Sequence, residues 1–264
     1  MNIGIIGSGN MASALAGGLI SSGIIRPDEL SMSDKSEGKL AVWQKNGVFT
    51  TEDNKEVLAH SDIVIFAVKP NVLPCVLEEA KEFAEDRIFI SIAAGFEISK
   101  IEESLGRTAK IVRAMPNTPA RVNCGMTVIA PNGSVSASEV KEVEKILSSV
   151  GEVIVLEEKY INAATAVHGS SPAYIYMLID AMADGAVKHG IPKSIALRLA
   201  AKAVEGSAKM VLESGEHPQK LKDDVCSPGG TTIAAVCELE RTGFSSSVQQ
   251  AIDACVEKAD SMSK

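Results

Sequence analysis

The stretch "GIIGSGNMASA", residues 4–14, decides the fold of the N-terminal half of the chain. It places Gly7-x-Gly9-x-x-Ala12 directly after an apolar run that predicts a strand over residues 2–6, and directly before a helical pattern. Gly7 permits the tight turn, Gly9 lets the backbone approach a pyrophosphate, and Ala12 lets helix and strand pack closely. The exposed amides and the helix dipole then stabilise phosphate charge. In this context we interpret the motif as a dinucleotide-binding site rather than an ordinary glycine-rich turn.

Outward from this motif, short β-branched runs alternate with longer amphipathic stretches up to about residue 156. The predicted strands span residues 2–6, 30–33, 62–68, 87–93, 110–115, 126–130 and 152–156, and the predicted helices span 10–23, 36–47, 71–84 and 136–151. Alternation of this kind predicts crossover connections and a mainly parallel sheet that is covered on both faces. The fold class is therefore α/β, with a Rossmann-like dinucleotide-binding domain over residues 1–158.

After Tyr160 the strand signals stop, and the remaining sequence shows only helical periodicity punctuated by glycine or proline. We expect an all-helical domain over residues 159–264 that binds substrate and mediates dimerisation. Its helices carry apolar positions on more than one face, which favours burial against a partner chain, although a compact monomeric bundle is the alternative. Met177, Met182 and Met210 lie at helical spacing, and we expect them in a core.

The composition excludes several classes of protein. The chain of 264 residues has a formal charge of −8 and no basic face, which argues against a nucleic-acid partner. The longest apolar run, residues 63–68, is far too short to span a membrane, and no secretory pattern precedes it, so we expect a cytoplasmic protein with no membrane contact. Five scattered cysteines indicate neither disulfides nor a metal site, and we expect most of them to be buried thiols.

The end of the second predicted strand, "SMSDKSEG", bears on the choice of dinucleotide. Asp34 could accept hydrogen bonds from the ribose hydroxyls of NAD, whereas Ser33, Lys35 and Ser36 could hold the additional phosphate of NADP. These signals conflict, and a solvated turn is a third reading. Three later strands also end in small or polar turns, "AVKP", "SIAAG" and "RAMPNTPA", at the sheet edge where ligands of open α/β sheets bind.

A second unusual turn is "CSPGGTT", residues 226–232, which precedes a helical pattern. Gly229 and Gly230 place no side chains over the first helical amides, so a small anion could reach several N–H groups. Ser227, Thr231 and Thr232 add neutral hydroxyl donors suited to a carboxylate. A serine or threonine N-cap that serves only its own helix is the alternative.

These motifs occur together with "HGSSPAY" (168–174) and "DDVCSPGGTTIAAVCELE" (223–240), and at this point the chain resembles the pyrroline-5-carboxylate reductase family over essentially its whole length. The resemblance implies the last step of proline biosynthesis, reduction of 1-pyrroline-5-carboxylate to L-proline by NADPH or NADH. It further implies a homodimer that can assemble into a homodecamer of five dimers.

The resemblance also implies the site residues. The coenzyme would contact Ile6, Gly7, Ser8, Gly9, Asn10, Met11, Asp34, Asn54, Ala67, Val68, Lys69, Pro70, Ala93, Ala94 and Gly95. The substrate carboxylate would bind Ser227, Gly230, Thr231 and Thr232, with Glu158 close to the ring, although a solvated acid is the other reading of Glu158. Thr232 is the predicted catalytic residue, because its hydroxyl could hydrogen-bond the imine nitrogen. Asp34 departs from the small or hydroxyl residue of NADP-preferring members, so we expect both coenzymes to be used.

Two rival functions remain at this stage. One is a 3-hydroxyacid-type dehydrogenase, which resembles this domain arrangement but carries an essential lysine on its glycine-rich helix. No lysine lies between Gly169 and Lys188, which disfavours that chemistry. The other is a dinucleotide-binding sensor without catalysis. That function does not explain why the turn at residues 226–232 is suited to binding an anion.

Overall fold

The computed structural model describes residues 1–85 and 87–263, and the chain forms two compact units. The first comprises Met1–Ser170 together with the C-terminal residues from Cys255 onward. The second comprises Ser171–Ala254. The helix α12 (Phe244–Ser263) contributes residues to both units. Each unit is described separately.

The first unit is built on one sheet with the strand order β3-β2-β1-β4-β5-β6-β7-β8 among the described residues. Every pair is parallel except β6 with β7. The strands are β1 (Ile3–Ile6), β2 (Leu30–Ser33), β3 (Phe49–Thr51), β4 (Ile63–Phe66), β5 (Ile88–Ser91), β6 (Lys110–Met115), β7 (Gly125–Pro131) and β8 (Gly151–Val155). The order reverses at β1, so the carboxyl end of β1 lies at the topological switch point where open α/β sheets bind ligands.

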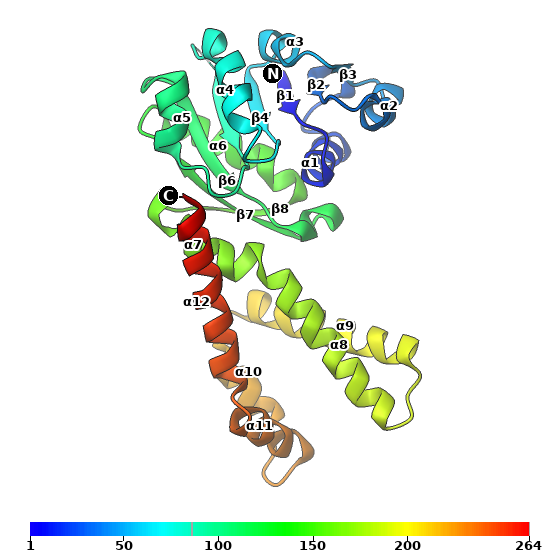
Figure 1. Ribbon diagram of the computed structural model, residues 1–264. Coiled ribbons are helices and arrows are strands. Elements are labelled where there is room, and N and C mark those ends of the chain that lie inside the picture. Colours follow the sequence, from blue (N-terminus) through cyan, green and yellow to red (C-terminus); the bar gives the residue numbers. More distant parts are fainter. Residues whose placement is uncertain (86, 264) are drawn as a thin grey trace. The chain divides into compact units, whose positions relative to one another are not determined.

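Helices cover both faces of this sheet (Figure 1), because successive side chains of a strand point to opposite faces. Ile3 and Ile5 pack against α1 (Asn10–Ser21), α2 (Glu37–Lys45) and α6 (Ala137–Leu147). Ile6 packs with the other layer, formed by α3 (Asn54–His60), α4 (Leu73–Ala80) and α5 (Ile98–Leu105). Both cores consist almost entirely of fully buried aliphatic side chains. The predicted α/β class and the mainly parallel sheet are confirmed.

Three short elements escaped sequence analysis: β3, α3 and α5. The strand β3 has three residues, and Phe49 at its start is exposed, so no buried apolar run marks it. The helix α3 is only seven residues long, and its N-terminus depends on the Asp53 side chain, which accepts a hydrogen bond from the Lys55 amide at 2.9 Å. β3 and α3 are too short to show the repeated periodicity on which the predictions relied, whereas α5 has buried Ile98, Ile101 and Leu105 at helical spacing, a signal that sequence analysis overlooked.

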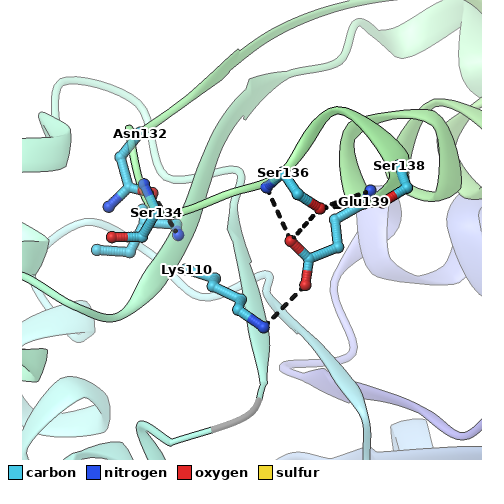
Figure 2. A network of polar contacts seen from close by, with 7 residues as sticks. Lys110, Asn132, Ser134, Ser136, Ser138 and Glu139 are labelled. Atoms are coloured by element: carbon cyan, nitrogen blue, oxygen red, sulfur yellow. Dashed lines mark hydrogen bonds and ion pairs between the residues drawn. The ribbon is translucent and has the colours of Figure 1, made fainter.

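The start of α6 shows how the helices of this unit are fixed to the sheet (Figure 2). The Ser136 hydroxyl accepts from the Glu139 amide, and the Glu139 carboxylate accepts from the Ser136 amide at 2.8 Å, which forms a capping box. Lys110 at the start of β6 completes the network, with its Nζ 2.8 Å from Glu139 Oε1. Hydrogen bonds from Lys110 and Ser136 lower the pKa of Glu139 from 4.5 to about 2.

The second unit contains α8 (Ser171–Lys188), α9 (Lys193–Ser214), α10 (Pro218–Val225), α11 (Thr231–Arg241) and the first part of α12. Its buried apolar side chains are three alanines, Ala183, Ala196 and Ala200, among the described residues. Many large apolar side chains are exposed instead, including Met177 at 73% and Leu212 at 72%. The expectation that Met177, Met182 and Met210 lie in a core is therefore wrong for the single chain, in which all three are exposed.

The compact units divide the chain differently from the expected domains 1–158 and 159–264. The segment from Glu158 to Ser170 carries no strand, yet it belongs to the first unit. It is held there by Ile161 and Ala166, which are fully buried. The change from strand to helix periodicity in the sequence does not reveal that this helical segment packs with the first unit.

No helix in the described part of the chain is both long enough and apolar enough to cross a membrane.

Candidate active site

The glycine-rich turn between β1 and α1 has the geometry that its sequence predicts. Gly7 adopts a left-handed conformation (φ 103°), and a Cβ at this position would lie 2.6 Å from the carbonyl oxygen of Ala67. Gly9 is the N-cap of α1, and a Cβ added there would meet no described atom within 4 Å. No side chain among the described residues caps α1, and its first turn has no acidic residue. The turn therefore offers free amides and open space at a positive helix end, which fits a dinucleotide phosphate.

Asp34 at the end of β2 is bonded directly to this turn. Its Oδ2 accepts hydrogen bonds from both the amide and the hydroxyl of Ser8, each at 2.8 Å, and its Oδ1 accepts from the Ser36 amide at 2.9 Å. Burial raises the pKa of the Asp34 carboxyl, but the Ser8 and Ser36 hydrogen bonds and nearby Lys39 outweigh burial, so the pKa lies below its ordinary value. Asp34 is therefore an anion at the position where sequence analysis expected the ribose contact.

The neighbouring polar residues are engaged within the protein. The Ser33 hydroxyl donates to Asn54 Oδ1 at 2.7 Å, and the Asn54 amide group donates to Glu79 at 2.7 Å. Lys35 donates to the carbonyl oxygen of Glu52 at 3.0 Å. Asn54, the first residue of α3, thus lies beside the end of β2.

Two further predicted coenzyme segments follow β4 and β5 at this edge. Ala67 continues from β4 and donates its amide to the carbonyl of Ile6 at 2.8 Å, so it lies beside the glycine-rich turn. Gly95 lies in the loop between β5 and α5 with φ 71°. The parallel arrangement of β1, β4 and β5 brings their carboxyl ends together, and with them the predicted residues Ile6 to Met11, Ala67 to Pro70 and Ala93 to Gly95.

The loop "RAMPNTPA" makes hydrogen bonds that hold the first unit together, a role that sequence analysis did not predict. Asn117 is buried; its Nδ2 donates to the carbonyl of His168 at 3.0 Å, and its Oδ1 accepts from the Met126 amide at 2.9 Å. The His168 ring contacts the carbonyl oxygens of Ala164 and Met115 at 2.6 and 2.8 Å. Asn117 therefore fastens the segment 165–169 to the sheet.

The turn before α11, in the second unit, is as bare as its sequence suggests. Gly229 is left-handed (φ 68°), and Gly230 is the N-cap of α11 with no capping side chain among the described residues. A Cβ at Gly230 would lie 2.5 Å from Ser227 Oγ and 3.1 Å from the Ser227 carbonyl oxygen, so a larger residue would crowd the turn and force Ser227 to move. The alternative reading, a serine or threonine N-cap, is wrong. In the described structure the hydroxyls of Thr231 and Thr232 take part in no hydrogen bond, while Thr232 is half-buried.

Glu158 is not the solvated acid that one reading of the sequence allowed. Its Oε1 lies 3.0 Å from Nη1 of Arg113 and accepts a hydrogen bond from the amide of Ile98 at 2.8 Å, at the start of α5. The Arg113 side chain is only 3% exposed, and its Nη2 donates to Asn162 at 3.2 Å. Sequence analysis missed Arg113, although a single cation inside the apolar run "IVRAM" was a usable signal, because buried arginines require partners.

The cysteine and metal expectations have separate outcomes. Cys75, Cys124 and Cys237 are exposed and Cys226 and Cys255 are half-buried, so the expectation of mostly buried thiols is wrong. Within residues 1–85 and 87–263, no group of three or more histidine, cysteine, aspartate or glutamate side chains is placed to hold a metal ion.

Two family models match the chain. The model for pyrroline-5-carboxylate reductase dimerisation matches residues 158–262. The model described as NADP oxidoreductase, coenzyme F420-dependent, matches residues 2–95. The first match includes the turn before α11 and the exposed helices, and the second includes the glycine-rich turn.

Full-length relatives carry the same description as the first model. Pyrroline-5-carboxylate reductase of Escherichia coli K12 is 47% identical over 264 residues, which cover 99% of this chain and 98% of that protein. Human pyrroline-5-carboxylate reductase 2 is 41% identical over 260 residues, which cover 96% and 81%.

Solved structures agree with this. The pyrroline-5-carboxylate reductase of Coxiella burnetii matches with a TM-score of 0.95 at 37% identity, covering 100% of this chain and 98% of that one. The Plasmodium falciparum pyrroline carboxylate reductase, solved with NADP bound, matches with a TM-score of 0.91 at 34% identity, covering 100% and 98%. Sequence identity over nearly the whole of both chains, with a bare glycine turn at each predicted site, shows that this protein belongs to the pyrroline-5-carboxylate reductase family.

Proposed function

We propose that this protein reduces 1-pyrroline-5-carboxylate to L-proline, the last step of proline biosynthesis, with NADPH as coenzyme and NADH as an alternative. Its family membership supports the reaction, and the Plasmodium falciparum relative with NADP bound supports the coenzyme. The observation that carries the proposal within this chain is the uncapped turn Gly229–Gly230 before α11, because a carboxylate substrate gives that turn a purpose.

The coenzyme would be held at the carboxyl ends of β1, β2, β4 and β5. The amides of Gly9 and of the first turn of α1 would bind its phosphates, and Asp34 would accept hydrogen bonds from ribose hydroxyls. When bound, the reduced coenzyme supplies the hydride. The remaining contacts that we propose are Ile6, Ser8, Asn10, Met11, Asn54, Ala67, Val68, Lys69, Pro70, Ala93, Ala94 and Gly95.

The substrate would be held by its carboxylate at the start of α11. The free amides of the first helical turn, with the hydroxyls of Ser227 and Thr231, donate to the two carboxylate oxygens. This fixes the ring and presents the C=N carbon for reduction, so that positioning supplies much of the rate. Glu158 has its Oε1 committed to Arg113 and Ile98, and its proposed approach to the ring would use the other oxygen.

Thr232 is the proposed catalytic residue. Its hydroxyl is free of protein partners in the described structure, so it can donate to the imine nitrogen. As the carbon accepts the hydride, the nitrogen takes up a proton, and the Thr232 hydroxyl would hold or relay that proton from water.

The chain's match to a dimerisation family indicates that it forms oligomers. We propose a homodimer formed through the exposed apolar helices of the second unit, with a decamer of five dimers as the larger assembly and the cytoplasm as the location. In this arrangement residues 1–158 act as the dinucleotide-binding domain, and residues 159–264 act as the substrate-binding and dimerisation domain.

The test is a steady-state assay of NADPH and NADH oxidation with pyrroline-5-carboxylate for the wild type and Thr232→Ala. Loss of a hydrogen bond to the reacting group should lower kcat/KM by about 5- to 150-fold. The matched control is Thr242→Ala at the other end of α11, whose hydroxyl donates to the carbonyls of Glu238 and Leu239 on its own helix. A wild type without substrate-dependent oxidation would refute the reaction, and an unchanged Thr232→Ala would remove Thr232 from it.

A further inference from the structure

The loop that joins β5 to α5, residues 92–97, contains three of the proposed coenzyme contacts, Ala93 to Gly95. Its first residues are tied to the sheet, since the Ile92 amide donates to the carbonyl of Phe66 at 3.1 Å and the Ala93 amide to Ser91 Oγ at 3.4 Å. Beyond this point the loop turns through the left-handed Gly95. Contacts from distant parts of the sequence decide where this second half lies.

The last turn of α12 lies against Gly95. A Cβ built at Gly95 would be 3.4 Å from Cβ of Met262 and 3.6 Å from the Met262 carbonyl oxygen. The loop therefore leaves room for no more than one methyl group between Gly95 and a residue more than 160 positions later in the chain. Both belong to the first compact unit.

A chain of hydrogen bonds fixes both ends of this contact. Asp260, two residues before Met262, accepts from Nδ2 of Asn162 at 2.9 Å. The Asn162 Oδ1 accepts from the buried Arg113. Arg113 also donates to Oε1 of Glu158, which in turn accepts a hydrogen bond from the Ile98 amide. Ile98 is the first residue of α5 and follows directly after the loop. One continuous network therefore connects the end of α12 to the end of the coenzyme loop.

The two halves of the network differ in burial. The Arg113–Glu158 pair is an inner tie: Arg113 is nearly inaccessible, and its Nε has no partner among the described residues, so removing Glu158 would leave an uncompensated buried cation. The Asn162–Asp260 bond is an outer tie between exposed atoms. Breaking the outer tie leaves no buried charge, so it loosens α12 from the loop without unfolding the unit.

We propose that Asn162 and Asp260 are positioning residues of the coenzyme loop: through Met262 and Arg113 they hold residues 92–97 in the conformation that receives the coenzyme. Preorganisation of this kind strengthens binding because less order has to be created when the coenzyme binds. The inference rests on the proposed function for the identity of the ligand, but the ordering of the loop is a property of the coenzyme-free chain.

The experiment compares Asp260→Leu with three other proteins: the wild type, Asp260→Asn, which retains an acceptor for Asn162, and Glu257→Leu, which removes an exposed charge one turn earlier on α12. Hydrogen–deuterium exchange of residues 92–98 is measured without coenzyme, followed by steady-state kinetics and an NADPH fluorescence titration. We expect faster exchange in this segment for Asp260→Leu alone, with a roughly threefold to tenfold rise in the KM and Kd for NADPH. The kcat and the KM for pyrroline-5-carboxylate should change less than about twofold.

Met262→Gly provides a second route to the same result, because it removes the Met262 Cβ, the side-chain atom nearest to Gly95, and leaves the hydrogen bonds in place. Unchanged exchange of residues 92–98 in both Asp260→Leu and Met262→Gly would overturn the inference, as would equal effects of Glu257→Leu. A uniform rise in exchange with a lower Tm would also overturn it, since it would indicate general destabilisation. If the wild type neither binds NADPH nor oxidises it, the proposed function fails, and the exchange data still decide the positioning role.

Discussion

The two compact units differ in the burial of their large apolar side chains: the first unit buries most of them, and the second leaves them exposed. In the first, strands such as β1 and β4 are completely buried between two helical layers, and Phe66 and Phe89 stack at 5.4 Å in one of the cores. In the second, the buried apolar side chains of the described residues are alanines, while methionine, leucine and tyrosine side chains are largely exposed. Large exposed apolar surfaces mark association sites, so the first unit is complete by itself and the second requires a partner surface.

The largest effect should come from a charge on the exposed apolar surface of the second unit. Met177→Glu on α8 would bury an unpaired carboxylate in each half of a symmetric interface, which costs several kcal/mol. We expect the species measured by light scattering to fall to the mass of one chain, 27.7 kDa, and activity to fall by roughly 100-fold.

Val122→Glu is the matched control for this variant. Val122 is 70% exposed, comparable with Met177 at 73%, but it belongs to the first unit. Its substitution should leave the oligomer intact. If Val122→Glu dissociates the protein and Met177→Glu does not, the contrast between the two units is wrong.

The next effect concerns the glycine-rich turn of the first unit. Gly7→Ala places a Cβ against the Ala67 carbonyl and forces alanine into a left-handed conformation, which should cost about 2 to 4 kcal/mol in the free energy of unfolding. Gly9→Ala meets no described atom and has an ordinary φ of −69°, so it should keep its stability but weaken NADPH binding roughly tenfold by blocking the phosphate. Urea denaturation measures the stability of each variant, and fluorescence titration measures its affinity for NADPH. Equal loss of stability in both variants would contradict the assignment of these glycines.

A smaller effect on stability is expected when the capping network at the start of α6 is broken. Glu139 has a pKa of about 2 in the folded protein and an ordinary value of 4.5, so its contribution is complete above about pH 4.5 and is lost as the pH falls towards 2. Glu139→Ala removes both the capping acceptor and the partner of Lys110, and should lower stability at pH 7 by about 1 to 2 kcal/mol. The difference from the wild type should shrink below pH 4, which denaturant midpoints across pH 2 to 7 would measure. A difference that stays constant over this range would exclude the capping network as its source.

The smallest effect is expected for the ion pairs of Lys193 in the second unit. Its Nζ lies 2.6 Å from Asp180 and 2.5 Å from Asp184, but all three side chains are well exposed. Solvent screens such pairs, so Lys193→Met should leave Tm unchanged within error. A clear fall in Tm would show that a partner chain buries this cluster, and would extend the interface to the start of α9.

Local pattern was sufficient for much of this protein. The glycine spacing at residues 7–12, the β-branched runs and the bare turn at residues 229–232 depend on neighbours in the sequence, and each was identifiable without coordinates. The family resemblance then supplied roles for residues such as Asn54 and Thr232. The short elements β3 and α3 were missed because their stability comes from contacts with the rest of the sheet, whereas the helical spacing of Ile98, Ile101 and Leu105 in α5 was a usable signal.

What the sequence by itself determined is the α/β class, because strand and helix periodicities alternate along the chain, and the two glycine turns, because Gly7 and Gly229 adopt left-handed conformations that larger residues avoid. Tertiary structure alone decided that Asp34 bonds to Ser8, that Arg113 is buried against Glu158 and Asn162, and that Met262 lies beside Gly95. These pairs are separated by 26 to more than 160 residues, and only the packing of sheet and helices brings them together.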